Sequence, residues 1–368
     1  MDNDKAFKNL INEAVVKLIL CVIKKVDKKF PAHFLEQIIP QLKDLELKDR
    51  VLLVTKALAA SFSKSYPENI NVIKQVIKND QLKGFQLWPF SEFISQFGLS
   101  HFDESMDAMY ELTQKFTSEF AIRPFIIQDH QKVLNHFQKL TSDPNVHIRR
   151  WVSEGTRPLL PWGQKISAFV NHPELAIGLL EKLKYDEEIY VRKSVSNHLN
   201  DISKNHPMLV IKVVDQWQKE CPAEHISKIA WIKKQALRTL IKKGHPGALK
   251  LIGVNGKGKI QIQGFKLDKK TYKLGEKMTF KFKMISQGKS RQSVVIDYGI
   301  DFLKANGKLG RKIFKLKNIE LDAGSSIEIT KTHSLKAITT MKFYSGLHQI
   351  CLQVNGVCLE TLPFSFRV

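Results

Sequence analysis

At 368 residues the chain is long enough for two domains, and its 43% hydrophobic content excludes a disordered protein. Its 58 Lys and Arg residues outnumber 36 Asp and Glu residues, a formal net charge of +22 that favours a polyanionic partner. The surplus is largest in residues 251–368, which hold 21 basic and 8 acidic side chains.

Residues 1 to about 250 read as helices, because apolar residues recur at spacings of three and four. The most apolar run, "AVVKLILCVI", is interrupted by Lys17 and is shorter than the roughly 18 residues that a membrane span needs. We therefore predict a buried helix, no membrane association and a cytoplasmic location. The cysteines have no zinc-site spacing, and we expect all four to be reduced thiols: Cys21, Cys221, Cys351 and Cys358.

The helical half contains a repeat. Three segments share a His-Pro start: "NHPELAIGLLEKL" from Asn171, "NHPMLVIKVVDQW" from Asn205 and "GHPGALKLIG" from Gly244. A second kind of helix precedes each one: "HIRRWVSEG", "YVRKSVSNHL" and "WIKKQALRTL". Two helices per unit at this period indicate HEAT-like repeats, which stack into a solenoid.

Basic residues recur at one position of these preceding helices: Arg149, Arg150, Arg192, Lys193, Lys233 and Lys234. Stacked repeats would align them in a row, which suits the neutralisation of a nucleic-acid backbone. The alternative is that these side chains are simply solvated. The excess of positive charge favours phosphate contact.

Carboxylates stand among these basic residues, where they would repel phosphates. Glu119 in "TSEFAIRPF", Glu154 in "SEGTRP" and Asp201 in "NHLNDI" lie on consecutive units. Such groups suit cleavage of a glycosidic bond, because an anion stabilises the oxocarbenium character that the sugar develops. Trp162, with Trp151 as a second candidate, would offer a flat face to a base or sugar. The alternative is a surface ion-pair cluster of Glu154 with the nearby arginines, and the spacing does not separate the two.

From about residue 255 the pattern changes to alternating apolar residues with turn signals, as in "KMTFKFKMI" and "SVVIDYGIDFL". Several short strands in this length fit a β-sandwich of immunoglobulin type. The predicted fold is therefore multidomain, with an all-α HEAT-like repeat solenoid at 1–252 and an all-β immunoglobulin-like sandwich at 258–368.

Several segments resemble a known family. "FTSEFAIRPFI", "IRRWVSEGTRPLLPWG" and "VRKSVSNHLNDISKNHP" are similar to signature segments of the AlkC branch of the AlkD/AlkC DNA glycosylases, which are HEAT-like-repeat proteins. "FLKANGKLGRKIFKLKNIEL" and "KTHSLKAITTMKFYSGLHQICLQVNG" resemble the immunoglobulin-like domain that one AlkC subgroup carries. The resemblance covers nearly the whole chain.

The resemblance implies hydrolysis of the N-glycosidic bond of cationic N3-alkylated bases, 3-methyladenine and 3-methylcytosine, in base excision repair. Glu119, Glu154 and Asp201 would be the catalytic carboxylates, and Trp162 would contact the lesion. DNA-binding or supporting roles would fall to Arg123, Arg149, Arg150, Arg157, Arg192, Lys193, Asn197, Asn200, Lys233, Lys234 and Lys342. In the loop "TTMKFYSG" this chain has Met341, Lys342 and Ser345 where the family pattern leads us to expect an arginine and a proline, so only a phosphate contact by Lys342 is expected there.

The expected partner is double-stranded DNA with alkylated bases, bound by a monofunctional, monomeric enzyme without cofactor or metal. One alternative is a non-catalytic HEAT-repeat scaffold that binds nucleic acid or protein. A metal-dependent nuclease is disfavoured, because the 12 histidines have no ligand spacing such as HxxH.

Overall fold

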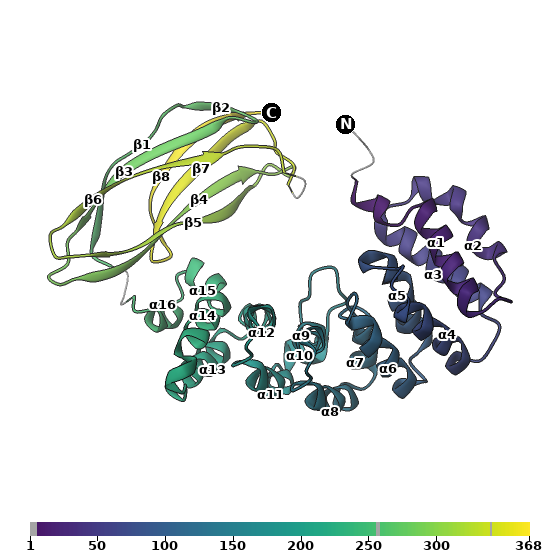
Figure 1. The fold of residues 1–368 in the computed structure, drawn as a ribbon. Helices are drawn as coiled ribbons and strands as arrows, with labels where there is room; N and C mark the ends of the chain where they lie inside the picture. The colour runs from purple at the N-terminus through teal and green to yellow at the C-terminus, as the bar shows by residue number, and fades with distance from the viewer. Residues whose placement is uncertain (1–5, 255–257, 339–340) are drawn as a thin grey trace. The chain divides into compact units, whose positions relative to one another are not determined.

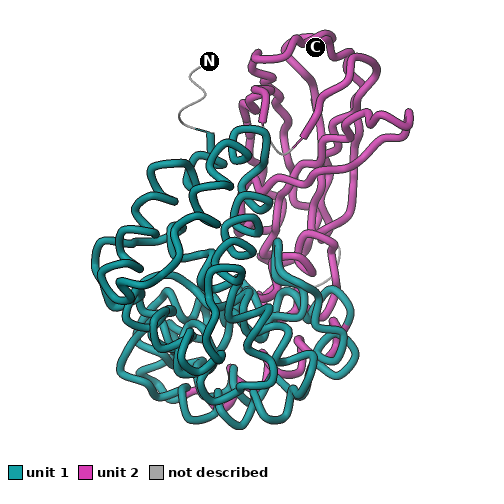
Figure 2. Tube along the Cα trace, turned by 90° about the vertical axis from the view of Figure 1, so that its right-hand side faces the viewer, with its two compact units in different colours: residues 1–205, 222–235 teal, residues 206–221, 236–368 magenta. Residues whose placement is uncertain are grey.

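The helical spacing of apolar residues in the first 250 positions is realised as short helices joined by turns. A computed structural model describes residues 6–254, 258–338 and 341–368. The chain divides into two compact units (Figure 2), one of Met1–Asn205 with Pro222–Gln235 and the other of His206–Cys221 with Ala236–Val368. The predicted domain division at 252–258 stays a prediction, and residues 255–257 within it lie outside the described residues.

The helices follow one another in chain order through the helical region (Figure 1). The α-helices are α1 (Glu13–Val26), α2 (His33–Gln37), α3 (Leu47–Ser61), α4 (Tyr66–Lys78), α5 (Trp88–Phe97), α6 (Phe102–Thr113), α7 (Ile122–Gln128), α8 (His130–Leu140), α9 (Val146–Gly155), α10 (Ser167–Asn171), α11 (Glu174–Leu183), α12 (Ile189–Ile202), α13 (Pro207–Lys219), α14 (Ile226–Ala236), α15 (Arg238–Lys242) and α16 (Pro246–Leu251). The 3₁₀ helices are η2 (Phe7–Leu10), η3 (Ile39–Asp44), η4 (Gly84–Leu87) and η5 (Ala223–His225).

Helices two or three elements apart pack together: α3 on α5, α4 on α6, α8 on α11 and α9 on α12. This places successive units side by side, as stacked helical repeats require. The apolar run near the N-terminus forms α1, whose buried face holds Val15, Val16, Ile19, Val22 and Ile23, so the predicted buried helix is confirmed. Among the described helices, none has both the length and the apolarity of a transmembrane span.

The C-terminal region forms a β-sandwich of two sheets. Its strands are β1 (Ile260–Leu267), β2 (Thr271–Lys273), β3 (Lys277–Ser286), β4 (Gln292–Leu303), β5 (Leu309–Leu321), β6 (Ser326–Ser334), β7 (Gly346–Val354) and β8 (Val357–Arg367). One sheet has the order β1-β3-β6 and the other β2-β8-β7-β4-β5, antiparallel except for β2 beside β8. Alternate side chains of β3, among them Phe280 and Phe282, enter a core shared with Ile300 and Ile350. The predicted fold class, helical repeats followed by an all-β domain, is confirmed.

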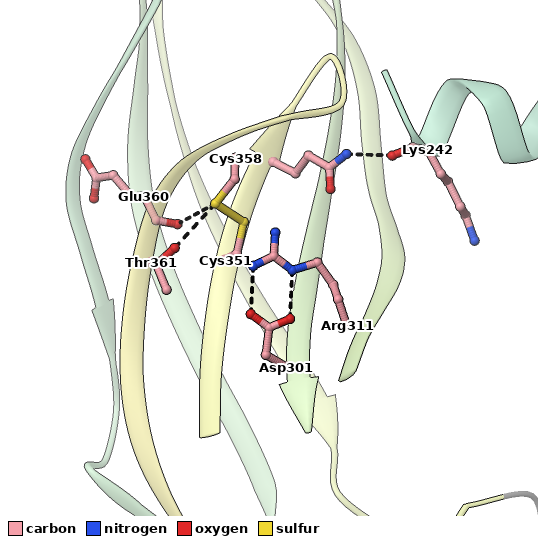
Figure 3. The surroundings of a disulfide bond; sticks show 8 residues. Lys242, Asp301, Arg311, Cys351, Cys358, Glu360 and Thr361 are labelled. Carbon is pink, nitrogen blue, oxygen red and sulfur yellow. Dashed lines mark hydrogen bonds and ion pairs between the residues drawn. A yellow bond between two sulfur atoms is a disulfide. The ribbon is translucent and has the colours of Figure 1, made fainter. Parts of the chain in front are cut away.

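The prediction of four reduced cysteines is wrong at one pair. Cys351 on β7 and Cys358 on β8 form a disulfide, with their Cα atoms 6.1 Å apart (Figure 3), whereas Cys21 and Cys221 are free. The β7–β8 hairpin brings the two sulfur atoms together. The register of the two strands shifts between Leu352 and Gln353. Strand pairing, which a spacing of seven residues does not reveal, decides this bond. Cysteine usage therefore no longer argues for a reducing compartment.

The tip of this hairpin lies against the end of α15. The side-chain amide of Gln353 donates to the carbonyl of Lys242 at 2.6 Å, and a Cβ added at Gly356 would collide with the backbone of Gly244. Glycine is therefore required at Gly356 both by its φ of 80° and by this close approach of two backbones.

Replacing Gly356 with alanine should destabilise the protein more than the same change at Gly324. Both positions have positive φ, but a Cβ at Gly324 would meet no atom within 4 Å. The difference between the two variants thus isolates the backbone collision, which we expect to lower the free energy of unfolding by about 1–3 kcal/mol. Urea unfolding of both variants measures it, and equal midpoints would contradict the close packing.

Candidate active site

The glutamate of the "SEGTRP" segment lies in the last turn of α9. Asn145 caps the start of this helix by accepting a hydrogen bond from the backbone N–H of His147 at 2.9 Å. The helix ends at Gly155, where a Cβ would stand 2.9 Å from a side-chain carbon of Ile122. The apolar face, with Ile148, Trp151 and Val152, is buried, and this anchors the helix that carries Glu154.

The three predicted carboxylates are joined by two arginines into one chain of ion pairs. Arg150 contacts Glu119 at 2.5 Å (Nη1–Oε2) and Glu154 at 3.6 Å (Nη2–Oε1). Arg157 contacts Glu154 at 2.6 Å (Nη1–Oε1) and Asp201 at 2.8 Å (Nε–Oδ2). We call these five residues the relay. The ion pairs of Glu154 expected from its i,i+4 and i+3 spacing thus exist, but the cluster extends to both other carboxylates.

The relay is buried rather than solvated. Glu119, Glu154 and Asp201 are 9%, 6% and 2% exposed. Burial opposes the charge of Arg150, but Glu154 and Glu119 outweigh it and raise the pKa of this guanidinium. Burial likewise opposes the charge of Arg157, and Glu154 and Asp201 raise its pKa. Both arginines are therefore charged, so each of the carboxylates has a cationic partner in a region of low dielectric.

The carboxylate oxygens differ in how fully they are bonded. Both oxygens of Glu154 accept hydrogen bonds, Oε1 from arginine and Oε2 from the hydroxyl of Ser194 at 2.5 Å. Asp201 is similarly occupied, with Lys204 donating to Oδ1 at 2.8 Å. At Glu119, Thr117 and Arg150 both contact Oε2, and Oε1 has no donor among the described residues. Glu119 is thus the relay carboxylate with an oxygen left to accept from another molecule.

Helix α12 presents a polar stripe to this cluster. Tyr190, Ser194, Asn197 and Asp201 follow one another at spacings of four, three and four residues, which places them on one helical face. The guanidinium carbon of Arg150 lies 5.4 Å from the centre of the Tyr190 ring. We did not predict Tyr190 or Ser194 as site residues, although their spacing from Asp201 on a helix could have indicated them.

Arg123 does not have the DNA contact that was among its predicted roles. It is fully buried in α7 and donates to the carbonyls of Gln164, of Gly155 at 3.2 Å and of Arg157 at 2.9 Å. Burial, with the nearby charge of Arg157, lowers the pKa of Arg123 to about 10. Its guanidinium is enclosed by the segment that follows α9 and holds that segment in place, which is the supporting role.

Trp162 is 68% exposed and has a φ of 65°, the left-handed region that a bulky residue rarely occupies. Its indole ring meets the ring of Phe7 edge to face, with centroids 6.4 Å apart. Trp151, the second tryptophan considered for the site, is instead fully buried against Phe137. The prediction that Trp151 offers a flat face to a base or sugar is therefore wrong, because its side chain lies on the buried apolar face of α9.

The row of basic residues divides into two groups. Arg149 donates to the carbonyls of Asp143 and Pro144 and pairs with Asp186 at 2.6 Å. One unit later, Arg192 donates to the carbonyls of Asp186 and Glu187. In both repeats the guanidinium bonds residues five and six positions earlier and fixes the turn before its own helix. Arg149 and Arg192 thus have a structural role, and their predicted phosphate contacts stay predictions.

The other predicted contacts have varied surroundings. Lys193 and Lys234 are exposed, Lys233 and Asn197 are half-buried, and Asn200 is buried. The DNA-binding or supporting roles of these residues stay predictions. Lys342 lies with its ammonium 5.7 Å from the centre of the Tyr344 ring, while the neighbouring residues 339–340 of the predicted loop lie outside the described residues.

Three comparisons bear on the chain as a whole. Residues 261–368 match the family described as the C-terminal Ig-like domain of the uncharacterised protein YhaZ. The uncharacterised protein YhaZ of Bacillus subtilis (strain 168) is 37% identical over 362 residues, which are 97% of this chain and 98% of that protein. The structure of the alkylpurine DNA glycosylase AlkC of Pseudomonas fluorescens, bound to DNA containing an abasic-site analogue, superposes with a TM-score of 0.90. The two sequences are 34% identical, and the match covers 99% of this chain and 100% of the AlkC chain.

Proposed function

This chain belongs to the AlkC family, and from that membership we propose that it is a DNA glycosylase that releases alkylated bases. Its substrates would be cationic N3-alkylated bases, 3-methyladenine and 3-methylcytosine, in double-stranded DNA. The AlkC relative is an alkylpurine DNA glycosylase, which supports the general activity. The observation that carries the proposal for this chain is the relay, which gathers three buried carboxylates in a protein of net charge +22.

The proposed reaction needs little acid catalysis. An N3-alkylated base already carries a positive charge, so the N-glycosidic bond breaks with its electron pair passing to the base, which departs neutral. The sugar gains positive charge in the transition state, and fixed carboxylates stabilise it. Water then adds to the sugar carbon and loses a proton, leaving an abasic site. Glu119, through its free Oε1, is the group we assign to this water.

The other relay residues act through position and charge. Glu154 and Asp201 have both oxygens occupied, so we assign them to holding the arginines and maintaining negative charge beneath the sugar. Arg150, at the outer end beside Glu119, would hold the DNA backbone near the lesion. The exposed indole of Trp162 would pack against the lesion nucleotide.

Exposed lysines on the repeat helices should contribute to DNA affinity through phosphate neutralisation. Replacing Lys193 or Lys234 with glutamine should weaken binding to all sequences alike and reduce the slope of log K against log salt by about 0.9 each. Binding measured by fluorescence anisotropy at several salt concentrations gives the slope. Lys17→Gln is the control, since Lys17 pairs with Glu13 on α1. Unchanged slopes in both test variants would remove these lysines from the DNA interface.

Incubation of the protein with methylated duplex DNA, followed by mass spectrometry of released bases, tests the function. Free 3-methyladenine or 3-methylcytosine supports the proposal, and 7-methylguanine in the same substrate serves as an internal comparison for specificity. Protein that binds this DNA and releases no base would leave the non-catalytic scaffold as the better interpretation.

A further inference from the structure

Trp162 lies on an irregular segment, and its indole is exposed. Neighbouring Pro161 is also exposed, and the left-handed backbone of Trp162 is a conformation that surrounding contacts have to maintain. Within the described part of the chain the indole contacts the ring of Phe7, which lies near the start of the chain. The orientation of Trp162 therefore depends on a segment far from it in sequence.

The N-terminal segment that carries Phe7 is anchored. Arg50, on α3 and only 4% exposed, donates to the carbonyl of Lys8 at 3.2 Å and that of Ile11 at 2.9 Å. It also donates to the side-chain oxygen of Asn9 at 3.3 Å. A buried guanidinium that bonds three residues of this short segment, Lys8, Asn9 and Ile11, holds the segment in place. Phe7 is accordingly presented from a fixed element, although its own ring is 55% exposed.

Phe7 also packs against other aromatic side chains. Its ring packs edge to face on Phe85 at 5.3 Å, and Phe85 contacts Trp88 at 5.8 Å. Trp88 in turn stacks on Phe120, which directly follows the relay residue Glu119. An aromatic series thus runs from beside Glu119 to Phe7, where it meets the indole of Trp162. This series connects the segment that carries Glu119 with the segment that carries Trp162.

We infer that Phe7 is a positioning residue, which holds the indole of Trp162 in the orientation needed to contact the lesion nucleotide. The inference rests on the proposed function. Phe7 and Trp162 remain 55% and 68% exposed although their rings contact each other, so the pair is accessible to a bound nucleotide. Loss of Phe7 would leave Trp162 in place but free to adopt other rotamers.

Phe7→Ala should lower the single-turnover rate of base release roughly tenfold, within the range that misplacement of a positioning group produces. Binding to undamaged DNA and the melting temperature should stay unchanged. Phe7→Tyr should restore the rate, because an aromatic edge returns. Leu10→Ala is the matched control, since Leu10 is also exposed on η2 and has no ring to offer.

A double-mutant cycle separates positioning from an independent role. If Phe7 acts through Trp162, Phe7→Ala should add no further loss in a Trp162→Ala background. An equal tenfold loss in that background, or a wild-type rate for Phe7→Ala alone, would overturn the inference.

A second measurement does not depend on activity. The emission of Trp162 is obtained by subtracting the spectrum of Trp162→Phe from that of the wild-type protein. Phe7→Ala should make this emission more sensitive to quenching by acrylamide. A protein that released no base but showed this change would refute the proposed function and leave the Phe7–Trp162 contact standing. Unchanged quenching would remove the contact itself.

Discussion

Glu119→Gln is expected to slow the release of alkylated bases by on the order of 10²–10³-fold in single-turnover assays. Glutamine has nearly the shape of glutamate and still accepts a hydrogen bond from Arg150, so the relay should keep its arrangement. What is lost is the negative charge and the free carboxylate oxygen that we assign to the attacking water. The effect should therefore fall on the chemical step rather than on DNA affinity.

The control for this variant is Glu104→Gln, which removes one carboxylate from an exposed position on α6. It should release bases at the wild-type rate. Binding of both variants to DNA with an abasic-site analogue shows whether the protein still reaches its site. Full activity of Glu119→Gln would reject Glu119 as the catalytic carboxylate, while leaving open that the protein is a glycosylase.

Arg157→Ala should be the most destabilising single change in the relay, at about 3–5 kcal/mol. Arg157 is buried between Glu154 and Asp201, at 2.6 Å and 2.8 Å, and its removal leaves both carboxylates short of a donor. The cost comes from buried charge without a partner rather than from the loss of an attractive contact. The unfolding midpoint of the helical signal in urea, followed by circular dichroism, measures it.

Two comparisons make this prediction specific. Arg291→Ala removes an exposed ion pair with Glu320 and should change stability by less than about 1 kcal/mol. The triple change Arg157→Met, Glu154→Gln and Asp201→Asn removes the charges together, so it should cost less than Arg157→Ala alone. A triple variant less stable than Arg157→Ala would mean that the ion pairs themselves are strongly stabilising.

The basic row shows that a repeat pattern can have a structural reason. Sequence repetition aligned Arg149 with Arg192, and each guanidinium fixes the turn before its own helix. The turn before this helix is a feature that the repeats share, so a residue that stabilises the turn is expected to recur in them. Lys193, next to Arg192 and exposed, remains a candidate for phosphate contact.

The helical repeats, the alternating strands and the position of Glu119, Glu154 and Asp201 on consecutive units could be predicted from local sequence patterns. These features are local, because periods of 3.6 and two follow from the backbone and from which face is buried. The spacing of Glu154 from Arg150 and Arg157 indicated possible ion pairs, which the structure contains.

The contacts between groups on distant segments could be seen only once the fold was known. It paired Cys351 with Cys358, enclosed Arg123 among carbonyls, and brought Phe7 against Trp162. It also left Glu119 as the relay carboxylate with an unoccupied oxygen. Contacts of this kind depend on how secondary-structure elements pack and on which polar groups become buried. The local periodicity of the sequence contains no information on either.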